Sequence, residues 1–246
     1  MTSAQVDPYR RQWELANRRA LADEGPLLAV LGDSAAQGVG AGSPFDGWVG
    51  QLRRRLDTID GHGWRVLNLS VSGARAHTVL DEQLPRLWRI GQPVDLVVCA
   101  VGGNDMYRST AAQVRDRFTR LLRALPAPGT WHDHQRTVVT TLPQGLGRRR
   151  AGIANELVRT LGPRRGLEVA DLWATTGPPW QGKYAEDMFH PNERGYADWV
   201  EAILGTIRPS HGSLGGDLPV ALRRRPPAQV LQGELADEER PHDGGQ

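Results

Sequence analysis

The chain has 246 residues, with 30 lysines and arginines against 28 aspartates and glutamates, so its formal charge is +2. This length suits one α/β domain with tails and is too short for two large domains. The small charge excess gives no case for a nucleic-acid partner or an anionic membrane despite a pI near 9.0, and no apolar run approaches the length of a membrane span.

The first residues are polar and rich in arginine, without the apolar centre of a signal peptide. Residues 8–24 combine helical spacing with many charges, which predicts an amphipathic lead-in helix that covers part of a sheet. The single cysteine, Cys99, lies inside an apolar run, where it is expected to be buried, and it cannot form an internal disulfide. We therefore expect a cytoplasmic protein.

Short apolar runs alternate with helical patterns through the middle of the chain. This alternation predicts a parallel sheet built from right-handed crossover units, in a three-layer α/β/α sandwich of the flavodoxin-like kind. The five predicted strands are residues 27–31, 65–69, 95–101, 137–142 and 167–172. The predicted helices between and after them are residues 48–56, 79–88, 111–125, 151–161 and 192–207.

The composition changes after Pro209, where glycines and prolines interrupt any periodicity. We expect a lead-in helix at residues 1–25, one folded domain at residues 26–208 and a disordered or loosely packed tail at residues 209–246. The tail contains a basic run and an acidic run. A solvated tail is the simpler interpretation, and a partner-binding segment is the alternative.

The first predicted strand ends in Gly32-Asp33-Ser34, which places Ser34 at the carboxyl edge of the sheet, where open α/β folds bind ligands. By itself this is an ordinary turn after a strand. The following residues 35–42 are small and rich in glycine, as the close approach of a substrate to backbone N–H groups requires. A serine nucleophile also needs a base, an orienting carboxylate and oxyanion donors.

Two loops at the same edge offer oxyanion donors. Gly73 follows the second strand and can leave its N–H open, although a turn glycine is the plainer interpretation. Asn104 follows the third strand and can donate its amide, whereas an Asx turn or a helix cap is the alternative. We expect a structural role of that kind for the neighbouring Asp105.

The segment Asp187-Met188-Phe189-His190-Pro191 precedes the last predicted helix. Pro191 suits a first helical position and favours an extended backbone at His190, which holds the imidazole at the entrance of the helix. Asp187 lies three residues earlier, so its carboxylate can reach one ring nitrogen while the other faces Ser34.

These four segments, in this order, resemble the conserved blocks of the SGNH (GDSL-type) hydrolase superfamily. The resemblance implies that Ser34 is the nucleophile and the first oxyanion donor, with Gly73 and Asn104 as the other donors. It implies that His190 is the base and that Asp187 supports it. It further implies five parallel strands between helices and hydrolysis of esters, thioesters or O-acetyl groups without a metal or cofactor. Ala35 departs from the usual leucine, at a position that packs and does not react.

We therefore expect a serine esterase that hydrolyses small-molecule carboxylic esters with short acyl or O-acetyl groups, through an acyl-enzyme on Ser34. An acyltransferase with the same residues and a non-catalytic binding module with the same fold stay open. The Gly-x-Ser-x-Gly elbow of α/β-hydrolases is absent from the sequence. Residues 177–184 have phosphate-loop spacing, but tyrosine replaces the required hydroxyl residue and two prolines remove N–H groups, so nucleotide hydrolysis is not expected.

Further candidates have ordinary explanations. His132 and His134 have metal-like spacing without an accompanying carboxylate or cysteine set, so no metal site is expected. Trp180, Lys183 and Tyr184 are candidates for a pocket wall, with core packing as the alternative. The arginines at residues 148–150 follow the fourth strand, where a solvated loop is the default and contact with an anionic substrate is the alternative. The other histidines are expected to be surface or core residues, namely His62, His77, His211 and His242.

Overall fold

The computed structural model describes residues 2–145 and 147–207. The tail predicted at residues 209–246, with its basic and acidic runs, His211 and His242, lies outside the described residues.

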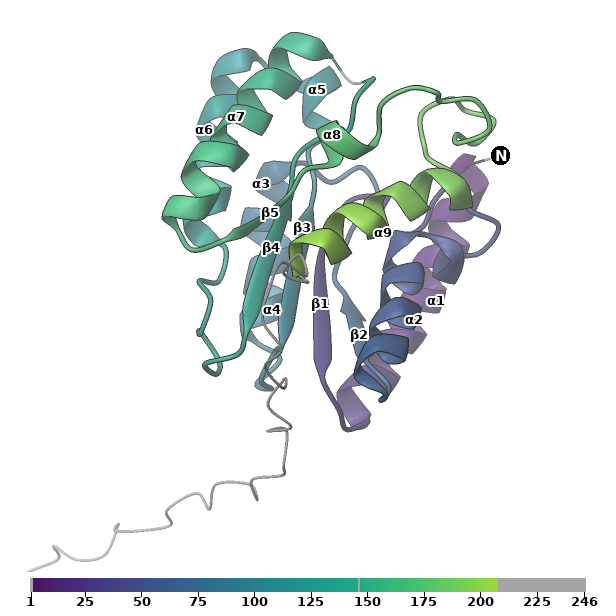
Figure 1. Ribbon diagram of the computed structural model, residues 1–246, viewed down its shortest axis with the longest axis vertical. Helices are drawn as coiled ribbons and strands as arrows, with labels where there is room; N and C mark the ends of the chain where they lie inside the picture. Colours follow the sequence, from purple (N-terminus) through teal and green to yellow (C-terminus); the bar gives the residue numbers. More distant parts are fainter. Residues whose placement is uncertain (1, 146, 208–246) are drawn as a thin grey trace, which may run out of the picture. The chain divides into compact units, whose positions relative to one another are not determined.

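The described residues form a parallel sheet of five strands in the order β2-β1-β3-β4-β5 (Figure 1). This confirms the predicted three-layer α/β/α sandwich. The chain runs from β1 outward to β2 and then returns to β3 on the other side of β1, so the carboxyl ends of β1 and β3 form the switch point where such sheets bind ligands. The strands are β1 (Leu27–Gly32), β2 (Arg65–Asn68), β3 (Leu96–Ala100), β4 (Arg136–Thr140) and β5 (Glu168–Ala170).

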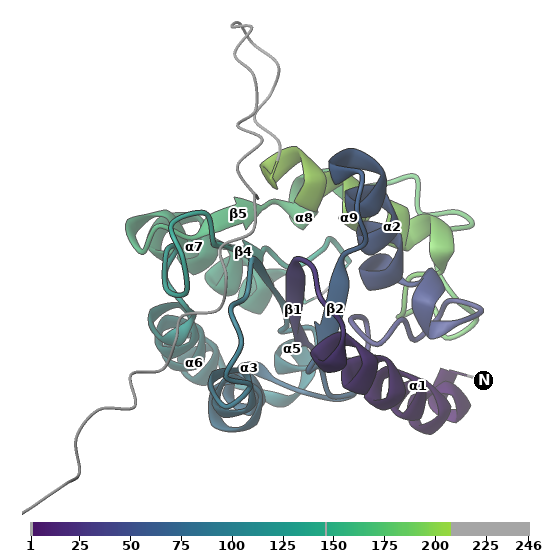
Figure 2. The same ribbon diagram turned by 90° about the horizontal axis from the view of Figure 1, so that it is seen from below.

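Helices cover both faces of the sheet (Figure 2). The long helices are α1 (Thr2–Ala22), α2 (Trp48–Asp60), α6 (Ala111–Ala124), α7 (Arg148–Arg164) and α9 (Glu193–Ile207). The short ones are η1 (Pro44–Asp46), α3 (Ala76–Thr78), η2 (Val79–Gln83), α4 (Leu84–Trp88), α5 (Asp105–Arg108) and α8 (Leu172–Thr175). Alternate residues of β1 face different cores, because Ala29 and Leu31 pack toward α4, α6 and α7, whereas Val30 packs toward α2 and α9. Burial on both faces explains why the strands are continuous apolar runs.

Helix α1 begins at Thr2, six residues before the predicted start at Pro8. Proline suggested a helix start, but residues on its amino-terminal side are held in the helix by contacts with the loop after β1, which the sequence pattern does not reveal. At the other end of α1, Asn17 forms two hydrogen bonds of 2.8 Å with the backbone N–H and C=O of Asn68. Because β2 is an edge strand, these backbone groups have no strand partner on that side, and the Asn17 side chain forms hydrogen bonds with them instead.

The helix predicted at residues 79–88 begins at Ala76 and contains a π-helical turn, η2. Its start is fixed by a hydrogen bond of 3.2 Å from the Arg75 N–H to the Thr78 hydroxyl. The π turn directs the fully buried Gln83 at the end of β1, where its amide binds the N–H and the C=O of Gly32 at 2.9 and 2.8 Å. Such turns are common near functional sites.

Two boundaries differ from the predictions at the other end of the sheet. The last strand ends at Ala170 because the Asp171 side chain caps α8 through the Ala174 N–H. Helix α7 begins at Arg148, so residues 148–150 form its first turn and are not a loop, although Arg148 and Arg149 are exposed to solvent as expected. Cys99 is buried as predicted, and burial raises its pKa to about 12. No helix within the described residues has the length and hydrophobicity needed to cross a bilayer.

Candidate active site

Ser34 lies in the turn that follows β1, at the carboxyl edge of the sheet. Its carbonyl oxygen accepts hydrogen bonds of 3.1 Å from the N–H groups of Gln37 and Val39, which close the turn. Among the described residues, its own N–H finds no hydrogen-bond acceptor. Ser34 also borders a pocket at this edge of the sheet.

Ser34, His190 and Asp187 form a continuous hydrogen-bonded relay. The Ser34 Oγ lies 2.8 Å from the His190 Nε2, and the His190 Nδ1 lies 2.6 Å from the Asp187 Oδ2. The Asp187 Oδ1 accepts hydrogen bonds from the N–H groups of Phe189 and His190 at 3.0 and 2.9 Å. Met188 takes a left-handed conformation with φ of 54°, which folds the chain back so that Asp187 can reach the imidazole.

The Asp187 carboxylate is strongly favoured over its protonated form. Its partial burial works against ionisation, but the imidazole and the two backbone N–H groups hold its pKa well below the usual range. An ionised Asp187 favours the tautomer with a proton on Nδ1 of His190, because that nitrogen faces the carboxylate. The Nε2 is then left to accept the proton of the Ser34 hydroxyl.

The glycine-rich loop after Ser34 packs against the loop that carries His190. A Cβ added to Gly40 would overlap the Pro191 carbonyl oxygen and lie 2.9 Å from the His190 Cβ. Gly40 also has φ of +101°, a conformation that favours glycine. The expected reason for the glycines was the close approach of a substrate, whereas at Gly40 the structure gives close packing between two loops of the site.

The two expected oxyanion donors lie at the same edge of the sheet but make no hydrogen bond to Ser34. Gly73 is exposed, has φ of +79°, and its N–H has no acceptor among the described residues. The Asn104 Nδ2 donates a hydrogen bond of 3.1 Å to the Ala74 carbonyl. An amide nitrogen carries two donors, and the Asp33 Oδ2 lies 3.5 Å from the same nitrogen, so the second N–H of Asn104 is held only by this long hydrogen bond.

Asp105 ties these two loops together. Its side chain is fully buried, and its Oδ2 accepts a hydrogen bond of 2.9 Å from the Ala76 N–H. This contact joins the loop that carries Gly73 to the loop that carries Asn104. Asp105 therefore has a structural role, as expected, but through a contact with the start of α3 rather than through a cap of its own helix.

Asp33 is a buried acid beside Ser34 to which the sequence argument gave no role. Only 7% of its surface is exposed. Burial, with the nearby charge of Asp105, raises its pKa to about 7, although the Ala35 N–H stabilises the carboxylate. Its Oδ2 lies 3.5 Å from the Asn104 Nδ2. The Gly-Asp-Ser segment places Asp33 next to the candidate nucleophile, but nothing in the residue spacing indicates that the Asp33 side chain is buried.

The pocket beside Ser34 has a volume of about 210 Å³ and is lined mainly by apolar side chains. Trp180 and Tyr184 belong to its wall. Lys183 does not line it, because its ammonium forms an ion pair of 2.7 Å with Asp198 on α9. The larger apolar and aromatic lining residues are Tyr107, Leu142, Tyr184, Phe189, Trp180 and Trp199.

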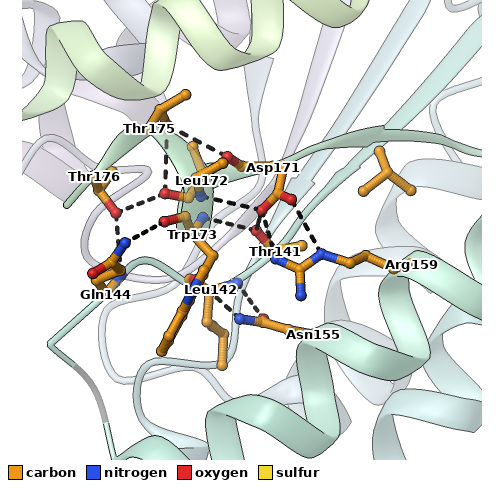
Figure 3. Close-up of polar contacts among 12 residues, drawn as sticks. Thr141, Leu142, Gln144, Asn155, Arg159, Asp171, Leu172, Trp173, Thr175 and Thr176 are labelled. Carbon is orange, nitrogen blue, oxygen red and sulfur yellow. Dashed lines mark hydrogen bonds and ion pairs between the residues drawn. The ribbon is translucent and has the colours of Figure 1, made fainter.

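One wall of the pocket is fixed by the polar network drawn in Figure 3. The Gln144 side chain donates a hydrogen bond of 2.8 Å to the Trp173 carbonyl, and its backbone N–H donates to the Thr176 hydroxyl at 3.1 Å. The Thr176 carbonyl accepts a hydrogen bond of 2.9 Å from the Trp180 indole. The indole is thus held to the end of α8, and the pocket has a wall of fixed position.

The three arginines at residues 148–150 lie next to this pocket but do not line it. Arg150 donates a hydrogen bond to the Met106 carbonyl. Arg148 borders a separate hollow, which shares Gln144, Gly145 and Trp180 with the pocket beside Ser34. No group of three or more histidine, cysteine, aspartate or glutamate side chains with metal-binding geometry occurs within residues 2–145 and 147–207.

A family model for GDSL-like lipases and acylhydrolases matches residues 30–197. The solved structure of TesA is 26% identical, covers 74% of this chain and 98% of its own, and superposes with a TM-score of 0.59. Axe2, an acetylxylan esterase from Geobacillus stearothermophilus, is 19% identical over 75% of this chain and 94% of its own, with a TM-score of 0.59. The esterase EstA from Pseudoalteromonas sp. is 17% identical over 74% of this chain and 97% of its own, with a TM-score of 0.56. No curated protein sequence matches.

Proposed function

Since the chain belongs to the family of GDSL-like lipases and acylhydrolases, we propose that it is a serine esterase that forms an acyl-enzyme on Ser34. The observation that carries this proposal is the relay from the Ser34 hydroxyl through His190 to an ionised Asp187, at the mouth of an apolar pocket. A hydroxyl is a weak nucleophile without such a base.

In the proposed reaction the Nε2 of His190 takes the proton of Ser34 as the hydroxyl oxygen attacks the acyl carbonyl carbon. The imidazolium is stabilised by Asp187, and it then protonates the leaving alcohol. Water, activated by the same imidazole, attacks the acyl-enzyme and releases the acid. Each step uses His190 in the position that its contact of 2.8 Å with Ser34 already defines.

The negative oxygen of the tetrahedral intermediate needs donors that are oriented in advance. The N–H groups of Ser34 and Gly73 have no other acceptor within the described residues, which supports this role for them. We assign the third donor to the Asn104 amide, whose long contact of 3.5 Å with the Asp33 Oδ2 would give way to the oxyanion. Its hydrogen bond of 3.1 Å to the Ala74 carbonyl and the Asp105 link between the two loops hold that amide in place.

The pocket supports a short apolar acyl group as the preferred substrate. Its lining is mainly apolar, and we expect Trp180, which is held through its indole to the Thr176 carbonyl, to limit the length of the acyl group. We therefore expect p-nitrophenyl acetate and butyrate to be cleaved with a higher kcat/KM than the laurate ester. Replacing Trp180 with alanine should shift the preference toward longer acyl chains.

The proposal is tested with p-nitrophenyl esters and a fluorophosphonate probe on the wild type, Ser34→Ala and Ser43→Ala. Ser43 is the matched control because its hydroxyl caps η1 at the Phe45 N–H. We expect Ser34→Ala alone to lose hydrolysis, and mass spectrometry to locate the label on Ser34. A folded wild type that is neither active nor labelled would refute the proposal. Products that depend on an added alcohol acceptor, with little free acid, would identify an acyltransferase instead.

A further inference from the structure

Helix α1 lies before the residues that the family model matches, which begin at residue 30. The helix runs along the edge strand β2, and its first residues lie at the end of the sheet where the strands have their carboxyl ends (Figure 1). At its other end the Ala20 carbonyl accepts a hydrogen bond of 2.7 Å from Arg65, at the start of β2. The helix therefore spans the sheet from one end to the other.

Three side chains of α1, spaced four residues apart, bind the backbone of the loop at residues 37–41. The Tyr9 hydroxyl donates a hydrogen bond of 2.7 Å to the Ala41 carbonyl. The Gln5 amide donates to the same carbonyl at 2.9 Å and accepts from the Gly40 N–H at 2.9 Å. The Trp13 indole donates to the Gln37 carbonyl at 3.1 Å. This spacing places all three on one face of the helix.

The loop that α1 holds contacts both ends of the proposed serine–histidine pair. The Val39 N–H is bonded to the Ser34 carbonyl at 3.1 Å. Gly40 is packed so closely against His190 and Pro191 that a methyl group would not fit.

We infer that α1 is a positioning element of the active site, in which Gln5, Tyr9 and Trp13 fix the loop at residues 37–41 between Ser34 and His190. The inference rests on the proposed function. The loop has no strand partner for the Gly40 N–H and the Ala41 carbonyl, and side chains of α1 supply their hydrogen bonds. The Tyr196 hydroxyl of α9 also binds this loop, at the Val39 carbonyl, so loss of the α1 contacts should loosen Gly40 against His190 rather than release the whole loop. A displacement of about 1 Å at a reacting pair costs about a hundredfold in rate.

The test compares a Gln5→Ala/Tyr9→Phe double variant with Asn17→Ala in the full chain. The double variant removes the contacts of Gln5 and Tyr9 with the loop. Asn17→Ala is the matched control, because it removes two hydrogen bonds between α1 and the sheet at Asn68. For each protein we would measure Tm, kcat and KM with p-nitrophenyl butyrate, and the rate at which a fluorophosphonate labels Ser34.

We expect the double variant to lower kcat and the labelling rate by about ten- to a hundredfold with little change in KM. Asn17→Ala should lower Tm to a similar degree and keep kcat. If the wild type is active and the double variant has the same kcat, the positioning role of α1 is overturned while the proposed esterase activity stands. Equal losses of kcat in both variants would also overturn it, because they indicate a general loss of stability. A wild type that is neither active nor labelled would refute the esterase and this inference together.

Discussion

Replacing Asp33 with asparagine should change the pH dependence of stability. The pKa of an aspartate is 3.8 before burial, and burial raises that of Asp33 to about 7. Between these values the folded protein keeps a proton that the unfolded chain has released. The stability contributed by this protonation is therefore complete below pH 3.8 and is lost as the pH rises through about 7.

The size of the effect follows from the two pKa values. They differ by about three units, and each unit corresponds to about 1.4 kcal/mol, so the wild type loses about 4 kcal/mol across the window. Asparagine is neutral at every pH and escapes this loss. The free energy of unfolding of Asp33→Asn, relative to the wild type, should thus increase by about 2 kcal/mol between about pH 5 and pH 7. Changes in hydrogen bonding to Ala35 and Asn104 add an offset that does not vary with pH.

Urea unfolding at several pH values measures this difference. The control is Asp7→Asn, which removes a carboxylate whose side chain is 73% exposed on α1. An exposed carboxylate stays hydrated in both states, so its replacement should give no comparable trend. Parallel stability curves for the wild type and Asp33→Asn would refute the reasoning, because they would mean that Asp33 is ionised in the folded protein throughout this range.

Three further outcomes are expected. Asn104→Ala should lower kcat by about a hundred- to a thousandfold, which is the loss found on removal of one oxyanion donor. The urea midpoint of unfolding should change little. A kcat near that of the wild type would remove Asn104 from the mechanism. Gly40→Ala should lower both Tm and kcat. Gly61→Ala should lower Tm alone, because Gly61 has φ of +70° but no atom lies within 4 Å of an added Cβ. Equal kcat values for the two variants would contradict the packing argument. Neutralising the arginines at residues 148–150 should leave KM unchanged for neutral and anionic esters, because these arginines do not line the pocket beside Ser34. A selective rise in KM for anionic esters would show that the arginines bind substrate.

The sheet could be predicted because its strands are buried on both faces and appear as apolar runs. Val97 and Val98 of β3, for example, face opposite cores, so both must be apolar. Element boundaries depend on single hydrogen bonds and were less predictable. The strand predicted at residues 167–172 ends early because Asp171 caps a short helix. The residues of α1 before Pro8 include Gln5, which contacts a loop 35 residues away. Neither contact has a periodic signal.

The contacts of the candidate site also differ in how far they could be predicted from the sequence. The pairing of Asp187 with His190 is local, since three residues separate them and the turn at Met188 brings them together. The contact of His190 with Ser34 joins residues 156 positions apart, and the motif alone does not determine its distance. Gly40 lies between the two loops, where its missing side chain allows close packing and α1 holds its N–H. The four sequence blocks thus predict the reacting groups, while on our inference the spacing between serine and histidine is set by residues outside those blocks. For this reason the variants at Gln5 and Tyr9 test the site more sharply than another substitution within the blocks.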